Sequence, residues 1–221
     1  MGLHLVEIYR SPNIGIFLKA NDKFVFVPKG LAQTKTSKLT ESLRVPAYYT
    51  SVAGSRLLGP LISMNNNGIL VSRIVEDYEM KELVNGTGLN VERFNSRFTA
   101  VGNLVVGNDR GAIASPILNP EAIKQIKDVM GTEVEVMSIK GFMQVGSLVV
   151  ATNSGAAVYP DATTAETERI SEALGVEVYP VSVNGGVPYI SSGLVANSTN
   201  AVVGDLTTGP ELVFMTRALK V

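Results

Sequence analysis

Five similar segments recur along this chain at a nearly constant spacing, and this recurrence constrains the fold more than any other feature of the sequence. Successive segments are 44, 43, 44 and 45 residues apart. Their anchor positions are Gly15, Gly59, Gly102, Gly146 and Ser191. A unit of about 44 residues is too small to bury a core alone, so the sequence predicts five similar units that are stable only together.

A polar turn lies six residues after each anchor. The turns occupy residues 21–23, 65–67, 108–110, 152–154 and 197–199. They are rich in Asn and Asp, which favour reversals because their side chains hydrogen-bond the nearby backbone. The residues that follow four of them tolerate a left-handed backbone, and we expect that conformation at Gly68, Gly111, Gly155 and Asn200.

The segments that flank these turns are predicted to be strands. Residues 103–107 and 112–115 form one such pair, and residues 148–151 and 156–159 form another. Because their apolar runs are continuous rather than alternating, we expect strands that are buried on both faces. A hairpin therefore opens each unit.

A helix is predicted after each hairpin. Asn119 is a capping residue before Pro120, and Thr163 with Glu166 and Thr208 with Glu211 fit the capping-box pattern. Apolar residues follow at helical spacing, and the weakest such signal lies in the first unit, around Leu39 and Leu43. Strand-like segments then follow the first four helices, at residues 47–52, 91–98, 134–139 and 177–183.

The two ends of the chain each carry part of an incomplete repeat. No strand follows the fifth helix, whereas the amino-terminal strand predicted at residues 3–9 belongs to no complete unit. A single strand exposes unpaired backbone groups, so we expect the amino-terminal strand to complete the fifth repeat. The predicted architecture is an α/β closed ring, a single domain over residues 1–221, and a monomer. A five-bladed all-β propeller has repeats of similar length, but its four strands per blade leave no room for the helix.

Composition limits the classes of function. Charged residues make up 18% of the chain and the net charge is −1, so the chain is not a general binder of nucleic acid. The apolar runs are far shorter than a membrane span, and we expect a cytoplasmic protein. Cysteine is absent, which excludes disulfides and thiolate chemistry. The densest basic stretch contains Lys29, Lys35, Lys38 and Arg44; it is either a solvated surface or a contact with a phosphate backbone.

Three segments carry a resemblance to a known family. They are residues 99–104 (TAVGNL), residues 201–212 (AVVGDLTTGPEL) and residues 51–59 (SVAGSRLLG). In these segments and along nearly the whole chain, the sequence resembles the translation initiation factor six family. It departs from the family pattern at Asn200, where glycine is usual, and over residues 29–45.

The resemblance implies a pentein fold and an activity of binding alone, without a cofactor. Family members bind the large ribosomal subunit on its subunit-joining face, near the sarcin-ricin loop, and so exclude the small subunit. Their release involves a translocase-type GTPase and a partner of the Shwachman-Bodian-Diamond type.

Enzymes that act on guanidino compounds share the pentein fold and are the strongest alternative. They use a cysteine nucleophile and a histidine, whereas this chain has no cysteine and its one histidine is His4, which we interpret as a partly exposed strand residue. Asp205 and Glu211 could form a carboxylate pair, but turn and capping roles explain them as well. The chain is therefore predicted not to be an enzyme.

The repeat alignment suggests which residues contact the ribosome. Positions that follow the anchors are equivalent, so their side chains should gather around the axis on one face, the face that the family turns toward the large subunit. These candidates are Ile16, Pro60, Asn103, Ser147 and Ser192. The alternative is that small residues here only allow five strands to pack closely.

Overall fold

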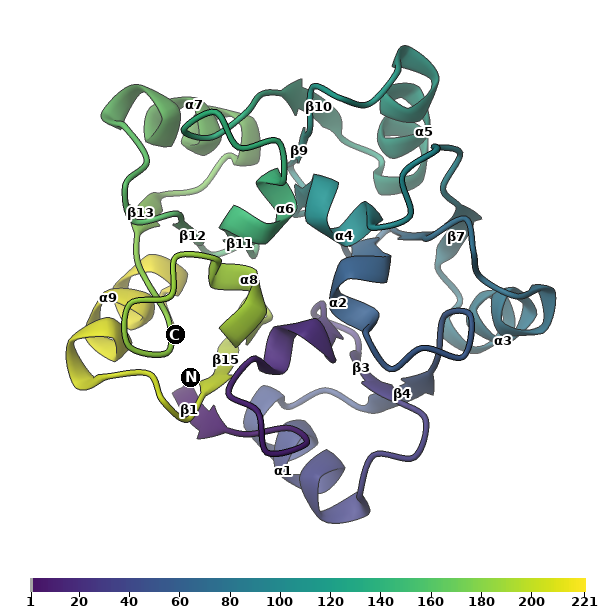
Figure 1. Cartoon of the computed structure of the whole chain (residues 1–221), viewed down its shortest axis with the longest axis horizontal. Coiled ribbons are helices and arrows are strands. Elements are labelled where there is room, and N and C mark those ends of the chain that lie inside the picture. The colour runs from purple at the N-terminus through teal and green to yellow at the C-terminus, as the bar shows by residue number, and fades with distance from the viewer. Residues whose placement is uncertain (1) are drawn as a thin grey trace.

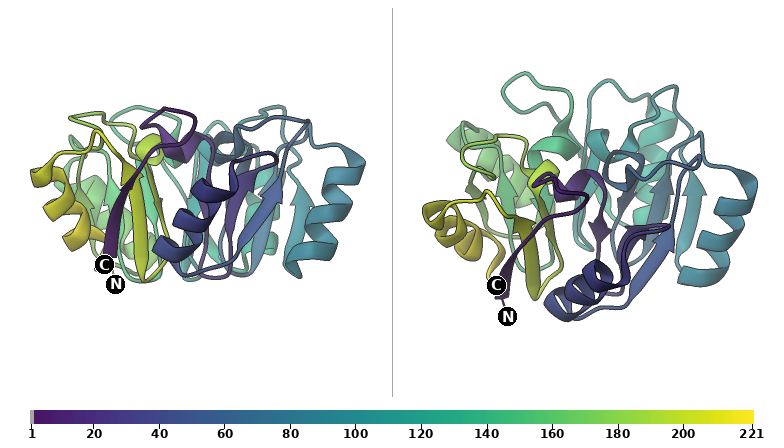
Figure 2. Two further views of the ribbon diagram at one scale, coloured as in Figure 1. Left: turned by 90° about the horizontal axis from the view of Figure 1, so that it is seen from below. Right: turned by 60° about the horizontal axis from the view of Figure 1, so that its bottom comes forward.

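The computed structural model describes residues 2–221, and over these residues five similar units surround a common centre (Figure 1). Each unit contains a three-stranded sheet, one long outer helix and one short inner helix. The short helices lie at one end of the strands and the polar turns lie at the other (Figure 2). The mixed α/β class and the five repeats were predicted correctly.

The long helices are eleven residues each and lie on the outside of the molecule (Figure 1). They are α1 (Gln33–Leu43), α3 (Asp77–Thr87), α5 (Pro120–Met130), α7 (Thr164–Leu174) and α9 (Gly209–Leu219). The predicted caps are present: Asn119 accepts a hydrogen bond from the Ala122 N–H, and Thr163 and Thr208 form capping boxes. In contrast, α1 has no side-chain cap, which agrees with its weak signal in the sequence.

Each predicted hairpin is an antiparallel strand pair. The pairs are β2 (Lys19–Ala20) with β3 (Val25–Pro28), β5 (Ile62–Met64) with β6 (Gly68–Val71), β8 (Val105–Gly107) with β9 (Gly111–Ala114), β11 (Val149–Ala151) with β12 (Ala156–Val158), and β14 (Leu194–Ala196) with β15 (Asn200–Gly204). A third strand pairs in parallel with the second strand of each hairpin. These third strands are β4 (Ala47–Thr50), β7 (Asn90–Arg93), β10 (Glu133–Val136), β13 (Val178–Pro180) and β1 (Gly2–Val6).

The third strand of the fifth sheet comes from the start of the chain. β1 pairs with β15 from Gly2 opposite Asn200 to Val6 opposite Gly204. The two ends of the described chain therefore lie beside the same sheet (Figures 1 and 2). This pairing covers the edge of β15 that would otherwise expose unpaired backbone groups.

The polar turns join the units through a cycle of hydrogen bonds. In each turn, the backbone N–H of the second residue donates to the side chain of the second residue of the next turn, at 2.7 to 3.2 Å. The cycle runs through Asp22, Asn66, Asp109, Asn153 and Ser198 and returns to Asp22. Each of these side chains therefore accepts from a neighbouring unit, and the spacing of 43 to 45 residues between them is the spacing of the repeat.

The anchors belong to elements that the sequence analysis did not predict. They lie in short helices: η1 (Ile14–Ile16), α2 (Leu58–Leu61), α4 (Val101–Leu104), α6 (Val145–Leu148) and α8 (Ile190–Gly193). The strands predicted to start at Asn103 and Leu148 therefore begin at Val105 and Val149. One helical turn is too short to show a 3.6-residue period, so these residues were read as part of the next apolar run.

The third strands also end earlier than predicted, because the chain turns sharply after them. Isolated bridges close these turns at Ile8 with Ser11, Val52 with Ser55, Ile139 with Phe142, and Val183 with Val187. Among residues 2–221 no such bridge follows β7, the third strand of the second sheet, and β7 ends at Arg93 instead of continuing to Phe98.

The left-handed backbone predicted for the residues after the polar turns is wrong. Gly68, Gly111 and Gly155 do not have positive φ. A Cβ at any of the three would instead collide with a backbone carbonyl in the long helix of the following unit. Asn200 begins β15, where its amide donates to Thr199 Oγ1 at 2.9 Å. Glycine is therefore needed at positions 68, 111 and 155 because the units pack closely there.

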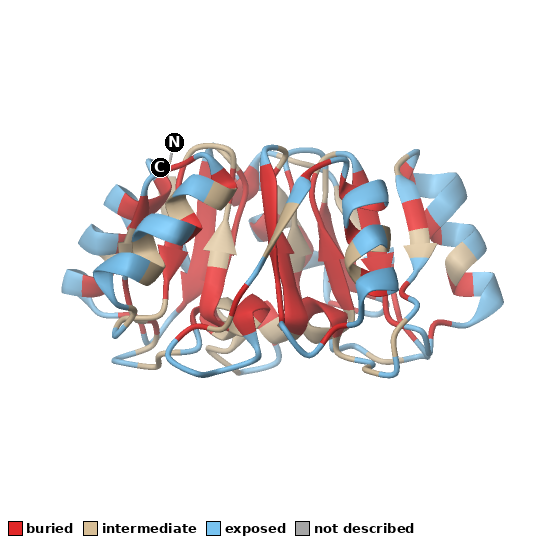
Figure 3. Cartoon of the chain, turned by 90° about the horizontal axis from the view of Figure 1, so that it is seen from above, coloured by how far each residue is buried: buried red, intermediate tan, exposed pale blue. Residues whose placement is uncertain are grey.

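Five hydrophobic clusters form the core, and each combines residues of two neighbouring units. In the third unit, the predicted stripe of Ile126, Val129 and Met130 packs against Val105 and Ala112. The strands are mostly buried and the outer faces of the helices are exposed (Figure 3).

Over residues 2–221, no helix has both the length and the apolar character to span a membrane.

Candidate functional site

The short helices gather around the centre and form one face of the molecule, which we call the short-helix face (Figure 1). Neighbouring short helices contact one another around the whole centre, from η1 through α2, α4, α6 and α8 back to η1. The face therefore combines one small element from every unit.

The anchor glycines allow this close approach. A Cβ on Gly59 would fall on the carbonyl of Gly15, and a Cβ on Gly102 would fall on the carbonyl of Gly59, well inside the 3.0 Å that real Cβ atoms essentially never cross. The same relation joins Gly146 to Gly102, and Gly15 to Ser191. The recurrence of glycine thus reflects backbone contact between successive short helices.

The five residues proposed from the repeat alignment lie together in the structure. They line a single depression at the centre of the short-helix face, beside Tyr189. All are partly exposed: Ile16, Pro60, Asn103, Ser147 and Ser192. Their gathering on one face was predicted from the repeat spacing, and their contact with the ribosome stays a prediction.

Asn103 differs from its four equivalents in its hydrogen-bonding capacity. Ser192 Oγ donates to the Tyr189 carbonyl at 2.7 Å, so that hydroxyl is already used. The side-chain amide of Asn103 has no hydrogen-bond partner among residues 2–221. It can therefore both donate to and accept from a bound partner.

Large apolar side chains are exposed in the loops that precede the short helices, and the sequence analysis did not find them. They are Tyr9, Leu57, Phe142, Met143 and Tyr189, all exposed by 37 to 45%. The Phe142 and Tyr189 rings lie 6.5 Å apart, and the Arg56 guanidinium lies over the Tyr9 ring at 5.4 Å. Aromatic residues, Met and Arg are enriched in protein interfaces. These residues occur in short loops, where no period marks them.

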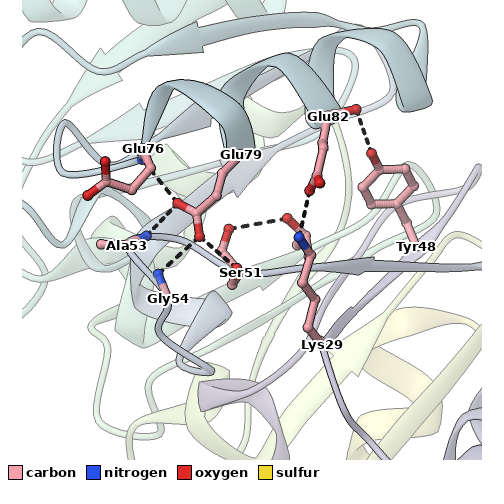
Figure 4. A network of polar contacts seen from close by, with 9 residues as sticks. Lys29, Tyr48, Ser51, Ala53, Gly54, Glu76, Glu79 and Glu82 are labelled. Atoms are coloured by element: carbon pink, nitrogen blue, oxygen red, sulfur yellow. Dashed lines mark hydrogen bonds and ion pairs between the residues drawn. The ribbon is translucent and has the colours of Figure 1, made fainter.

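Glutamates at the third position of three long helices hold the loops of this face. The Glu79 carboxylate accepts hydrogen bonds from the Ala53 N–H at 2.7 Å, the Gly54 N–H at 3.0 Å and Ser51 Oγ at 2.6 Å (Figure 4). Glu211 holds the Gly185 and Gly186 N–H groups in the same way, and Glu166 holds that of Lys140. The carboxylate of each helix therefore fills a nest of N–H groups in the adjoining turn.

These contacts give Glu211 a structural role. Burial by itself raises the pKa of Glu211, but hydrogen bonds from the Thr208 N–H, the Ser182 hydroxyl and the Gly186 N–H outweigh burial and lower the pKa to about 2. Asp205 is exposed in the preceding loop. The capping role proposed for Glu211 is therefore confirmed.

Glu211→Gln is expected to flatten the acid dependence of stability. The folded-state pKa of about 2 lies below the usual 4.5, so the carboxylate stabilises the fold above pH 4.5 and this contribution is lost as the pH falls toward 2. The difference in unfolding free energy between wild type and variant should shrink by about 3 kcal/mol across that window. Urea unfolding followed by circular dichroism measures it, with Asp205→Asn as the exposed control. Parallel curves for wild type and Glu211→Gln would contradict this account.

The basic stretch of the sequence is mostly engaged in surface contacts. Lys29 pairs with Glu82 at 2.7 Å and Lys35 with Glu7 at 3.1 Å, and Lys38 donates to the Leu5 carbonyl. These contacts favour a solvated surface over a phosphate contact.

The family of the chain follows from comparison with known proteins. The family model described as the eIF-6 family matches residues 3–218. The chain belongs to the eIF-6 family. This match confirms the resemblance seen in residues 51–59, 99–104 and 201–212.

Relatives in this family are named Translation initiation factor 6. The chain is 41% identical over 144 residues to the protein of Cenarchaeum symbiosum, covering 65% of each chain. It is 43% identical over 138 residues to that of Nitrosopumilus maritimus, covering 62% of each. The chain thus spans just under two thirds of these relatives' length. Among solved structures, ArgZ, an arginine dihydrolase from the ornithine-ammonia cycle in cyanobacteria, aligns with a TM-score of 0.49 at 12% identity, over 75% of this chain and 29% of that chain.

A second, smaller cavity in this eIF-6 family member shares Gly15, Gly59 and Ser191 with the depression. Lys19 lines it, at the position that Ser63, Val106 and Val150 occupy in other units. Burial lowers the pKa of Lys19 to about 8. Within residues 2–221, no three His, Cys, Asp or Glu side chains converge in a group that could hold a metal ion.

Proposed function

We propose that this member of the eIF-6 family is a closed ring of pentein type that binds the large ribosomal subunit on its subunit-joining face and blocks association with the small subunit. The ring would be one domain over residues 1–221, with the amino-terminal strand completing the fifth repeat. The cyclic hydrogen bonds between polar turns and the unbroken contacts between short helices support this architecture. Because no sheet edge needs a second chain, we expect a monomer.

The observation that carries the functional proposal is the composition of the short-helix face. Partly exposed residues line its centre, and exposed Tyr, Phe, Met and Leu side chains lie in the loops that precede the short helices. This arrangement of a shallow centre with apolar anchors suits a protein or RNA surface better than a small substrate. The family resemblance supplies the identity of the partner, the large subunit near the sarcin-ricin loop, and the release partners of the GTPase and Shwachman-Bodian-Diamond types.

A guanidino-directed enzyme is the alternative that the pentein fold suggests. The sequence supplies no thiolate, and His4 is exposed in the middle of β1, opposite Val202. A nucleophilic mechanism of the thiolate class therefore lacks its nucleophile. We propose binding without catalysis and without a cofactor, so that a chelator leaves binding unchanged.

Co-sedimentation with isolated ribosomal subunits tests the proposal. We expect binding to large subunits and none to small subunits, and added protein should reduce the joining of the two. Equal binding to both subunits would overturn the proposal.

Asn103→Ala should weaken large-subunit binding by roughly 1 to 2 kcal/mol, about 5- to 30-fold, because the free amide lies at the centre of the face. Asn103→Trp should weaken binding further. The thermal stability of the free protein should hardly change, since the side chain has no partner among residues 2–221. Asn90→Ala, an exposed asparagine at the opposite end of the sheets, is the matched control. Normal binding by Asn103→Trp would place Asn103 outside the interface, and unfolding would make it structural.

A further inference from the structure

Three of the five long helices carry a glutamate that fills the adjoining loop, and two do not: α1 has Lys35 at this position and α5 has Ala122. In the second, fourth and fifth units, the glutamate at the third position of the long helix accepts backbone N–H groups of the preceding turn. In the third unit this helical position is Ala122, and the preceding loop, residues 94–100, forms no isolated bridge. No glutamate carboxylate therefore enters the loop of residues 94–100 from this position of α5.

Arginines surround a hollow at this place. Arg73, Arg93 and Arg97 line it together with Asn119 and residues 94–96. Arg73 follows β6 and Arg97 precedes α4, so both lie at the end of the sheet where the short helices are. We call this hollow the arginine pocket. Its residues come from three separate loops.

Two of the three guanidinium groups are not neutralised. Arg93 is paired with Asp77 at 2.6 Å and also donates to the Val75 carbonyl. Arg73 and Arg97 form no ion pair among residues 2–221: Arg73 makes a long contact of 3.5 Å with the Ser96 carbonyl, and Arg97 lies over the Phe98 ring at 4.8 Å. The pocket therefore has an excess of positive charge on a chain whose net charge is −1.

Neutral groups add further hydrogen-bond donors. The Asn119 carbonyl oxygen accepts from the Ala122 N–H at 3.0 Å, so its NH2 group remains available as a donor. Asn119 caps the eleven-residue helix α5, whose amino terminus carries a partial positive charge. A bound anion would thus meet donors from side chains and from a helix terminus.

The loop is held in place before any ligand arrives. Gln125 of α5 accepts from the Asn95 N–H at 2.8 Å and donates to the Arg93 carbonyl at 3.0 Å and to Glu92. These bonds fasten the backbone of the loop to the helix. Binding then requires ordering only the long arginine side chains, which keeps its entropic cost small.

We propose that the arginine pocket binds a phosphate group of an RNA strand. This inference rests on the proposed function, because the RNA would be that of the large subunit, and it names a second contact on the rim of the short-helix face. Two free guanidinium forks and the asparagine NH2 group offer donors from several directions. That set fits the tetrahedral oxygens of a phosphate, whereas one fork already satisfies a flat carboxylate.

The salt dependence of large-subunit binding tests the proposal. Arg73→Gln and Arg97→Gln should each weaken binding roughly 3- to 10-fold near 100 mM salt and reduce the slope of log K against log salt by about one. Arg44→Gln removes the same charge beside the polar turns at the opposite end of the sheets and should change neither. If wild type does not bind large subunits, the proposed function fails. If wild type binds and the two variants keep its affinity and slope, this inference alone fails.

A second measurement separates RNA from an acidic protein partner. The Nε–H signals of Arg73 and Arg97 in the free protein would be followed by nuclear magnetic resonance during titration with a short single-stranded RNA and with a glutamate-rich peptide of equal charge. The RNA should shift both signals at lower concentration than the peptide does. An equal or stronger response to the peptide would overturn the assignment to phosphate.

Discussion

Removal of residues 1–10 is expected to abolish the cooperative fold of the whole chain, because β1 contributes to two units at once. It pairs with β15 along five residues of the fifth sheet. Val6 and the following Ile8 are buried with Leu18 and Val202 in the core that the first and fifth units share. Loss of two buried side chains of this size costs roughly 3 to 6 kcal/mol before the lost hydrogen bonds are counted. Total stabilities of about 5 to 15 kcal/mol leave little margin.

Circular dichroism and thermal unfolding of the truncated protein measure this effect. A synthetic peptide of residues 1–12, added in trans, should restore a cooperative transition by replacing the missing strand. The same peptide with Val6→Asp and Ile8→Asp should not restore it, because it would place charges in a core that excludes water. If the truncated protein unfolds at the wild-type temperature without the peptide, the strand is not needed to complete the fifth unit.

The sequence predicted those elements whose physical signal repeats. Helix α5 could be located because a capping residue, a proline at the first position and an apolar stripe all agree at residues 119–130. The hairpins could be located because the same polar turn recurs five times in register. The gathering of Ile16 and Asn103 on one face also followed from the register, since equivalent positions in similar units must lie at similar places around the centre.

Features without a recognisable pattern of residue types could not be predicted in this way. The short helices contain three or four residues, too few to show a period. The arginine pocket joins Arg73 to Arg97, which are separated by a helix and a strand, and it lies at the start of a helix that carries Ala122 where three other long helices carry a glutamate. Glycine is required at position 68 because a Cβ there would collide with the Val129 carbonyl of the next unit. Such contacts between units are specified by the folded arrangement and leave no local pattern in the sequence.

Gly102→Ala is expected to destabilise the protein by at least about 3 kcal/mol, although it adds a single methyl group. Gly102 lies in α4, where the new Cβ would collide with the carbonyl of Gly59 and lie 2.6 Å from the carbonyl oxygen of Ile62. Both obstacles are backbone atoms of the second unit, so neither can rotate away as a side chain would. Relief requires α2 and α4 to separate, and that movement disturbs the packing of both units.

Gly209→Ala is the matched control, because the same methyl group would meet nothing within 4 Å and the residue does not have positive φ. Alanine there should be neutral or slightly stabilising, since it lowers the entropy of the unfolded chain at the start of α9. Urea unfolding of the two variants beside wild type gives the comparison directly. Equal stability of Gly102→Ala and Gly209→Ala would show that the short helices can move apart at little cost. In that case backbone contact between them would not be the reason why glycine recurs at the anchors.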